Sequence, residues 1–320
     1  MNDKKIYILL PVHNRKKITE RFIIGLLGQT WDNYHLILID DGSVDGTGEM
    51  VKGYLPDATV IKGTGNWWWA GCLQQGINWL QKHNVNRDDI VLIINDDVVI
   101  KSKFLSNGIA FLENKKKTLL LAQSIDETTM EPVESGVVAD LKMHRFTVAK
   151  KGEVINCLST RGLLLRFSDI IEIGGFYPKI LPHYGSDYEY TIRAYKKGFQ
   201  LRTIPSFHLE IDHDETGMHF LPDSDVLGAI RNVFSKRYVP NPIYRSTFII
   251  LISPKKRLTR LIYPFWKRAF CIVFHKIKNS VLVFLSKLKK KYCLIISIYK
   301  VIPSNICSNE SKFFLLYESF

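Results

Sequence analysis

The C-terminal part of this 320-residue chain lacks acidic side chains. No Asp or Glu occurs between Val226 and Asn309, whereas the same segment holds seventeen Lys and Arg. Residues 1–225 carry 26 basic and 29 acidic residues, a net charge of −3, so the formal charge of +13 comes from the remainder. This asymmetry predicts a near-neutral globular part followed by a basic extension that contacts an anionic surface, either a membrane or nucleic acid.

Three further absences narrow the class of protein. The five cysteines are widely spaced, without a Cys-x-x-Cys pair or a metal-ligand spacing, which indicates free thiols in a reducing compartment. No apolar run approaches the roughly 18 to 20 residues of a transmembrane helix. A first strand is expected within five residues of the N-terminus, which leaves no room for a signal peptide. We therefore expect a cytoplasmic protein, free or peripheral on the inner face of the membrane.

An unbroken apolar strand is predicted at Leu36–Ile39, and it ends at Asp40 and Asp41, followed by Gly42 and Ser43. Strands buried on both faces are typical of parallel sheets, and ligands bind where such strands end. A turn needs only one acid, and two adjacent carboxylates repel each other. The pair therefore predicts a ligand-binding edge.

A second strand end repeats this pattern. The apolar residues Ile90–Ile94 precede Asn95, Asp96 and Asp97. Buried carboxylates are costly without a cation or donors, and a divalent cation such as Mg²⁺ or Mn²⁺ that bridges carboxylates and substrate phosphates would stabilise them. His213 lies among acids further along the chain, and it is either part of a solvated loop or another metal ligand.

Two other stretches are candidate site segments. In the run that begins at Gly63, the third glycine of a Gly-x-Gly-x-x-Gly dinucleotide loop is replaced by Trp68, so that fingerprint fails. Trp67, Trp68 and Trp69 cannot all face one core, and they form either a wall for a sugar ring or a hydrophobic lid. Asp187 lies at the start of a predicted helix, where it is either a cap or a general base.

The order of these segments resembles the family 2 glycosyltransferases, inverting enzymes of GT-A fold that use nucleotide diphosphate sugars. The resemblance covers about residues 5–237, and within the family it is closest to bacterial rhamnosyltransferase-like enzymes of surface polysaccharide synthesis. It depends on the following segments: Leu10 to Arg15, Gln29-Thr30, Asp40 to Ser43 with Asp45 and Thr47, Asn95 to Asp97, Gly174 to Phe176, Ser186-Asp187 before Arg193-Ala194, and His213.

The resemblance implies roles for particular residues. The nucleotide would be held by Pro11, His13, Asn14, Arg15 and Asp41. The acidic strand ends and the tryptophan run add Asp40, Asp96, Trp68 and Trp69 as expected contacts of the nucleotide sugar. The metal, Mg²⁺ or Mn²⁺, would be bound by Asp97 and His213, with Asp96 as the second choice because Asn95 stands at the first position of the family's Asp-x-Asp motif. Ser186 replaces the Glu of the family's Glu-Asp pair, and Asp187 remains as the catalytic base.

These inferences predict an α/β protein with a mixed, mostly parallel sheet flanked by helices. Residues 1–237 would form the GT-A domain, with nucleotide binding in about 1–100 and acceptor binding and catalysis in 101–237. Residues 238–320 would form a basic amphipathic helical extension. The expected donor is UDP-, dTDP- or GDP-linked, and the acceptor is a glycan or a lipid-linked glycan. The alternatives are a sugar-1-phosphate nucleotidyltransferase and a non-catalytic nucleotide-sugar-binding scaffold.

The basic extension has three interpretations. Between Arg257 and Lys291 the sequence interleaves Lys and Arg with Leu, Ile and Phe, as in helices that lie on an anionic membrane surface. We expect a membrane rather than nucleic acid as the partner, because the segment is rich in large apolar residues. An oligomerisation arm is the third interpretation.

Overall fold

The computed structural model describes residues 4–129, 131–150, 152–211, 225–253 and 258–291. The chain divides into two compact units, each with more contacts inside it than to the other. Among the described residues, those up to 211 and 247–253 form the first unit, and those in 225–246 and 258–291 form the second. The domain boundary at residue 237 stays a prediction.

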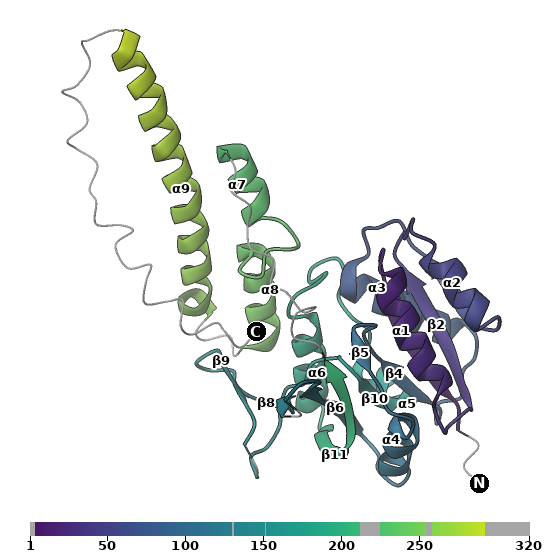
Figure 1. Cartoon of the computed structure of the whole chain (residues 1–320). Coiled ribbons are helices and arrows are strands. Elements are labelled where there is room, and N and C mark those ends of the chain that lie inside the picture. Colours follow the sequence, from purple (N-terminus) through teal and green to yellow (C-terminus); the bar gives the residue numbers. More distant parts are fainter. Residues whose placement is uncertain (1–3, 130, 151, 212–224, 254–257, 292–320) are drawn as a thin grey trace. The chain divides into compact units, whose positions relative to one another are not determined.

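A nine-stranded mixed sheet lies at the centre of the first unit (Figure 1). The order is β3-β2-β1-β4-β10-β6-β11-β5, with β7 paired to β6. Strands β3, β2, β1, β4, β6 and β11 share one direction, whereas β10, β5 and β7 run antiparallel to their neighbours. The bounds are β1 (Ile6–Val12), β2 (Tyr34–Asp40), β3 (Thr59–Lys62), β4 (Ile90–Ile93), β5 (Val98–Val99), β6 (Thr118–Asp126), β7 (Pro132–Glu134), β10 (Leu163–Arg166) and β11 (Gln200–Ile211). The predicted α/β class and mixed sheet are confirmed.

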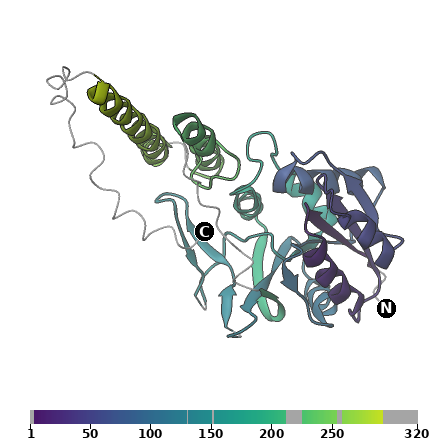
Figure 2. The same ribbon diagram turned by 45° about the horizontal axis from the view of Figure 1, so that its top comes forward.

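Helices cover both faces of this sheet (Figures 1 and 2). Apolar side chains of α1, α2 and α4 share one buried cluster with one face of the strands, and those of α3, α5 and α6 share a second cluster with the other face. Strands buried on both faces explain the unbroken apolar runs in the sequence. The helices are α1 (Lys16–Leu27), α2 (Thr47–Tyr54), α3 (Trp68–Lys82), α4 (Phe104–Leu112), α5 (Phe167–Ile173) and α6 (Ser186–Lys196).

Besides the large sheet and its helices, the described residues form a hairpin and three more helices. Strands β8 (Val137–Asp140) and β9 (Arg145–Val148) form a separate two-stranded sheet, visible in Figure 2. The helices are α7 (Val226–Val233), α8 (Pro242–Ile252) and α9 (Leu258–Lys291). In the second unit, α7 and α9 pack together through a small apolar cluster. None of the described helices is both long and apolar enough to cross a membrane.

Candidate active site

The loops that follow β1, β2, β3 and β4 meet at one edge of the sheet. These strands are parallel neighbours, with Val12 paired to Asp40 and Leu9 paired to Ile93. Parallel neighbours bring their carboxyl ends to the same edge, where ligands bind in open α/β sheets. The two acidic strand ends predicted from the sequence are therefore brought together.

Asp41 holds the loop that enters α3. Its buried carboxylate accepts hydrogen bonds at Oδ1 from the Gly65 N–H (2.8 Å) and at Oδ2 from the N–H groups of Trp67 (2.8 Å) and Trp68 (3.1 Å). Gly42 follows with φ +77°, and a Cβ there would lie 2.8 Å from Gly65 N, so the turn requires glycine. Asp41 therefore orders the tryptophan loop, and its contact with a nucleoside stays a prediction.

The loop after β1 is tied to the loop after β2. His13 Nδ1 donates to the Asp41 carbonyl oxygen (2.7 Å), and Asn14, at φ +52°, accepts at Oδ1 from the Val44 N–H (2.8 Å). Asp40 Oδ1 accepts from the Ser43 N–H (2.8 Å). The exposed His13 and Asn14 side chains are thus fixed at the edge where a nucleoside is expected. Pro11 differs from them, because it is a buried residue of β1.

Asp96 and Asp97 are buried side by side, with exposed fractions of 3% and 7%. Arg15, at the N-terminus of α1, reaches both: its Nε lies 3.3 Å from Asp96 Oδ1, and its Nη2 lies 3.4 Å from Asp97 Oδ2. The Thr19 hydroxyl also donates to Asp96 Oδ2 (2.8 Å). Arg15, predicted to contact the nucleotide sugar, lies in this structure on the predicted metal-binding pair.

The acidic pair has the chemistry of a divalent-cation site. Burial raises the pKa of Asp96 to about 6, and the Arg15 charge and the Thr19 hydrogen bond oppose this effect. Asp97 Oδ1 is buried and has no hydrogen-bond partner among the described residues. A buried carboxylate oxygen without a partner beside a second carboxylate fits a hard cation such as Mg²⁺ or Mn²⁺.

A further metal ligand is not found in the described part of the chain. No group of three or more His, Cys, Asp or Glu side chains that could hold a metal ion occurs there. His213, the predicted partner of Asp97, lies outside the described residues. Ile211, the last described residue of β11, pairs with Val98, so this strand ends beside the segment that carries Asp97.

The three tryptophans are all half-buried, as expected for residues that cannot share one core. Trp67 and Trp69 pack on the apolar cluster beneath α3, and Trp69 Nε1 donates to Thr160 Oγ1 (3.0 Å). Trp68 has φ +58°, and its ring lies 5.4 Å from that of His183. The Trp68 ring thus lies against the segment before α6.

Asp187 lies in the first turn of α6 and is partly exposed. Gly185, at φ +81°, begins the helix, and Ser186 Oγ donates to the His183 carbonyl (2.6 Å). The N-terminus of a helix favours a negative charge. A partly exposed carboxylate in this position suits a proton acceptor.

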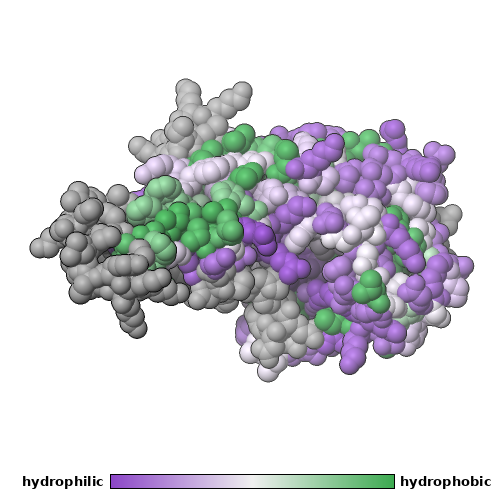
Figure 3. Space-filling model, turned by 90° about the horizontal axis from the view of Figure 1, so that it is seen from above, coloured by the Kyte–Doolittle hydropathy of each residue, from purple (hydrophilic) through white to green (hydrophobic). Residues whose placement is uncertain are grey.

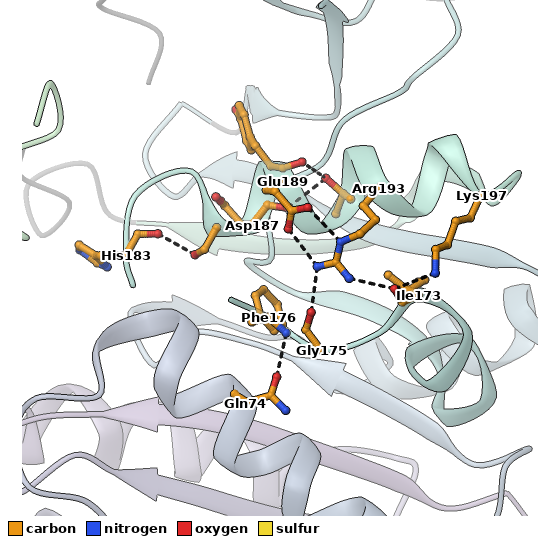
Figure 4. A network of polar contacts seen from close by, with 12 residues as sticks. Gln74, Ile173, Gly175, Phe176, His183, Asp187, Glu189, Arg193 and Lys197 are labelled. Carbon is orange, nitrogen blue, oxygen red and sulfur yellow. Dashed lines mark hydrogen bonds and ion pairs between the residues drawn. The ribbon is translucent and has the colours of Figure 1, made fainter. Parts of the chain in front are cut away.

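A polar network fixes the helix that carries Asp187 (Figure 4). The buried Glu189 carboxylate accepts from Arg193 Nε and Nη2, both at 2.9 Å, and Arg193 also donates to the carbonyls of Ile173 and Gly175, both at 2.8 Å. Gln74 of α3 accepts from the Phe176 N–H (2.8 Å). Sequence reasoning did not assign these side chains, although the i, i+4 spacing of Glu189 and Arg193 was a usable signal.

Sequence comparison links this arrangement to known proteins. The profile described as Glycosyl transferase family 2 matches residues 7–173. The rhamnosyltransferase WbbL of Escherichia coli is 26% identical over 143 residues, which cover 40% of this chain and 54% of that protein. A UDP-N-acetylglucosamine–dolichyl-phosphate N-acetylglucosaminyltransferase of Methanococcus voltae is 36% identical over 52 residues, 16% of this chain and 20% of that protein. The chain thus spans about half of the length of WbbL and a fifth of the length of the Methanococcus voltae protein.

Solved structures share the fold. The mannosyltransferase PcManGT of Pyrobaculum calidifontis, in complex with GDP-Man and Mn²⁺, has a TM-score of 0.52 at 13% identity, covering 89% of this chain and 80% of that one. TarS 1–349 of S. aureus, in complex with UDP-GlcNAc, has a TM-score of 0.52 at 15% identity, covering 83% and 79%. At such identities the likeness shows the fold alone, which is the GT-A fold. Because the family profile covers more than half of the sequence, this chain belongs to glycosyl transferase family 2.

Proposed function

We propose that this chain transfers a sugar from a nucleotide diphosphate donor to a hydroxyl of a glycan or lipid-linked acceptor in cell-surface polysaccharide synthesis. The observation that carries the proposal is the meeting of three groups near one sheet edge. The buried Asp96–Asp97 pair follows β4, the loop held by Asp41 enters α3, and the segment before Asp187 contacts that loop. Ala70 N donates to the Pro182 carbonyl (3.0 Å) and fixes this last contact.

The proposed reaction is a single displacement. Asp187 accepts the proton of the acceptor hydroxyl while that oxygen forms a bond to the anomeric carbon and the bond from this carbon to the diphosphate oxygen breaks. Attack from the face opposite the diphosphate inverts the anomeric configuration. When bound by Asp97 and Asp96, with His213 as the predicted further ligand, Mg²⁺ or Mn²⁺ supplies Lewis-acid stabilisation of the leaving nucleoside diphosphate.

The finer donor and acceptor assignments come from the relatives. UDP and GDP donors are candidates because the solved neighbours include complexes with GDP-Man and with UDP-GlcNAc, and dTDP is kept as the third candidate from the sequence resemblance. WbbL makes a rhamnosyl donor the first to test. We place Pro11, His13, Asn14, Asp40 and Asp41 around the nucleoside, with Trp68 and Trp69 beside the sugar.

The test is donor hydrolysis with and without Mn²⁺. We expect Asp187→Asn to reduce release of nucleoside diphosphate at least about a hundredfold with nucleotide affinity unchanged, since general bases contribute about 10² to 10⁴ in rate. Asp88→Asn, a change at an exposed position, is the matched control. Equal hydrolysis by Asp187→Asn and wild type would refute the assigned base. No hydrolysis of any donor by wild type would favour a scaffold. Release of pyrophosphate from a nucleoside triphosphate and a sugar 1-phosphate, supplied in a parallel assay, would favour a nucleotidyltransferase.

We further propose that the second unit docks on the anionic cytoplasmic face of the membrane. Seven exposed large apolar side chains of α9 fall within an arc of about 80° on its helical wheel. They are Tyr263, Trp266, Phe270, Phe274, Ile277, Val281 and Phe284. The exposed Lys267 and Lys278 lie along one edge of this arc, which we call the α9 stripe. Figure 3 shows hydrophobic and hydrophilic side chains side by side in the helical unit. An apolar stripe bordered by cations is typical of helices that lie in an anionic lipid interface.

A further inference from the structure

Arg15 neutralises the Asp96–Asp97 pair without forming a tight fork on either carboxylate. The two N–O distances are 3.3 and 3.4 Å, longer than the roughly 2.8 Å of a strong charge-assisted hydrogen bond. Arg15 Nε has no hydrogen-bond partner among the described residues. The guanidinium thus spans both acids loosely.

The acids depend on this charge in the absence of a metal. Their side chains are 4% and 8% exposed, whereas the Arg15 side chain is 34% exposed. Two adjacent buried carboxylates are strongly unfavourable unless a cation lies beside them. Among the described residues Arg15 is the only cation in an ion pair with either acid, and Thr19 contributes a neutral donor to Asp96 alone.

A divalent cation and the guanidinium would compete for the same pair of carboxylates, since Arg15 lies against Asp96 Oδ1 and Asp97 Oδ2 while Asp97 Oδ1 has no partner among the described residues. A metal bound at about 2.1 Å from Asp97 would lie within a few ångströms of Arg15 if the side chain stayed in place, and the two positive charges would repel each other. The carboxylates are fixed by burial, whereas Arg15 is partly exposed at the end of a long side chain. Arg15 is therefore the group that moves.

We propose that Arg15 is a displaceable counter-cation of the metal site, which makes binding of the metal and binding of the nucleotide diphosphate cooperative. This inference rests on the proposed metal site at Asp96 and Asp97. A metal alone must displace Arg15 into solvent. With the diphosphate present, the displaced guanidinium gains phosphate oxygens as new partners, for which its planar fork is well suited.

The loop geometry favours a movement of the side chain alone. The main chain before Arg15 is fixed by the Asn14 N–H, which donates to Ser43 Oγ (2.9 Å), and the main chain after it by the Lys16 N–H, which donates to Asp45 Oδ2 (3.0 Å). The displaced side chain therefore stays anchored at the edge where the donor is expected. By linkage, the nucleotide and the metal then increase each other's affinity by the same factor.

The experiment measures Mn²⁺ binding by electron paramagnetic resonance of free Mn²⁺, alone and with saturating UDP, dTDP or GDP. We expect Arg15→Met to bind Mn²⁺ alone about tenfold more tightly than wild type, within the usual range of coupling between sites. The gain in Mn²⁺ affinity caused by the nucleotide should be smaller in Arg15→Met than in wild type. Lys17→Met removes the same charge from an exposed position of α1 and should change the affinity less than twofold.

The outcomes separate this inference from the proposed function. Wild type that binds Mn²⁺ as tightly as Arg15→Met, or an equal change in Lys17→Met, refutes the counter-cation alone. Absence of Mn²⁺ binding in every protein and with every nucleotide refutes the metal site and the inference with it. Arg15→Lys, which keeps a charge but not the fork, is titrated in parallel and should fall between wild type and Arg15→Met. It provides the comparison if Arg15→Met does not fold.

Discussion

Individual buried carboxylates in this chain differ in how they are stabilised. Asp41 accepts three main-chain N–H bonds, whereas Asp169 of α5 accepts one from the Arg166 N–H (3.2 Å) and is 5% exposed. Burial raises the pKa of Asp169 to about 6, and the main chain and charge of Arg166 oppose this effect. The ionised form of Asp169 is therefore a cost to the folded state at neutral pH.

This cost predicts a pH-dependent effect of Asp169→Asn. The folded protein holds the Asp169 proton to a higher pH than the unfolded chain does, so this residue's contribution to stability falls as the pH rises from about 4 to 6. The stability of Asp169→Asn relative to wild type should thus rise with pH. The difference in unfolding free energy, variant minus wild type, should be about 1 kcal/mol larger at pH 7.5 than at pH 5. Urea denaturation at both pH values measures it, with Asp88→Asn as control. A difference that does not change with pH would contradict the assignment.

At this scale the sequence predicts where site residues lie but not which way they point. The acidic strand ends converge as expected, because parallel strands of known polarity leave no other arrangement. Arg15 lies in the loop after β1, at this same edge. Its long side chain turns to Asp96 and Asp97, and its direction depends on acidic residues that are distant in the sequence. Pro11 lies inside β1, two residues past its last pairing with β4, where its missing N–H interrupts no bond to that strand.

Among the elements, α3, α5 and α6 are joined by the turn at Gly174–Phe176. Arg193 links α6 to this turn, and Gln74 links α3 to it. A Cβ on Gly175 would lie 2.1 Å from Gln74 Oε1, so this position requires glycine while the bond to Gln74 stays in place. The turn therefore sets the distance between α3 and α6, the helix that carries Asp187.

Breaking this link should destabilise the first unit. Arg193→Met leaves the buried Glu189 without its partner and removes donors from two carbonyls, and the loss of one partner of a buried pair costs about 3 to 5 kcal/mol. Glu189→Gln in the same chain should recover part of this loss, because it removes the unpaired charge. Chemical denaturation of the single and double variants measures the coupling energy between Arg193 and Glu189. If the stability losses of the two single variants simply add up in the double variant, the two side chains do not stabilise each other.

The boundaries of some helices and strands depend on contacts that sequence patterns do not show. Strand β11 runs through Pro205 to Ile211, with a register shift between Thr203 and His208. Proline lacks an N–H and interrupts the ladder without ending the strand. Helix α3 begins at Trp68, whose N–H group donates to the Asp41 carboxylate. The antiparallel insertion of β10 between β4 and β6 depends on pairings between distant segments, which periodicity does not encode.

For the whole molecule, the charge asymmetry of the sequence coincides with a distinct helical unit. The described part of that unit contains α7 and α9, which pack through Val233, Tyr238 and Ala269. On another side of α9 the α9 stripe is largely exposed, with Phe270 63% exposed. Trp266 is 45% exposed and also donates to Ser246 Oγ (2.9 Å). The first unit is nearly neutral, and the second unit is basic and exposes apolar side chains. This division suits the proposed enzyme, which would bind a soluble donor and work at a lipid surface.

The α9 stripe predicts a defined loss of membrane binding. Trp266→Ser with Phe270→Ser should weaken sedimentation with phosphatidylglycerol vesicles at least about tenfold, because each buried aromatic side chain contributes about 1.5 to 3 kcal/mol. Binding to phosphatidylcholine vesicles should be weaker for wild type, since Lys267 and Lys278 then lack anionic partners. Leu227→Ser on α7, also at an exposed apolar position, is the matched control and should bind like wild type. Unchanged vesicle binding of the double variant would refute the membrane surface, and a wild-type dimer that the double variant converts to monomer would assign the stripe to self-association instead.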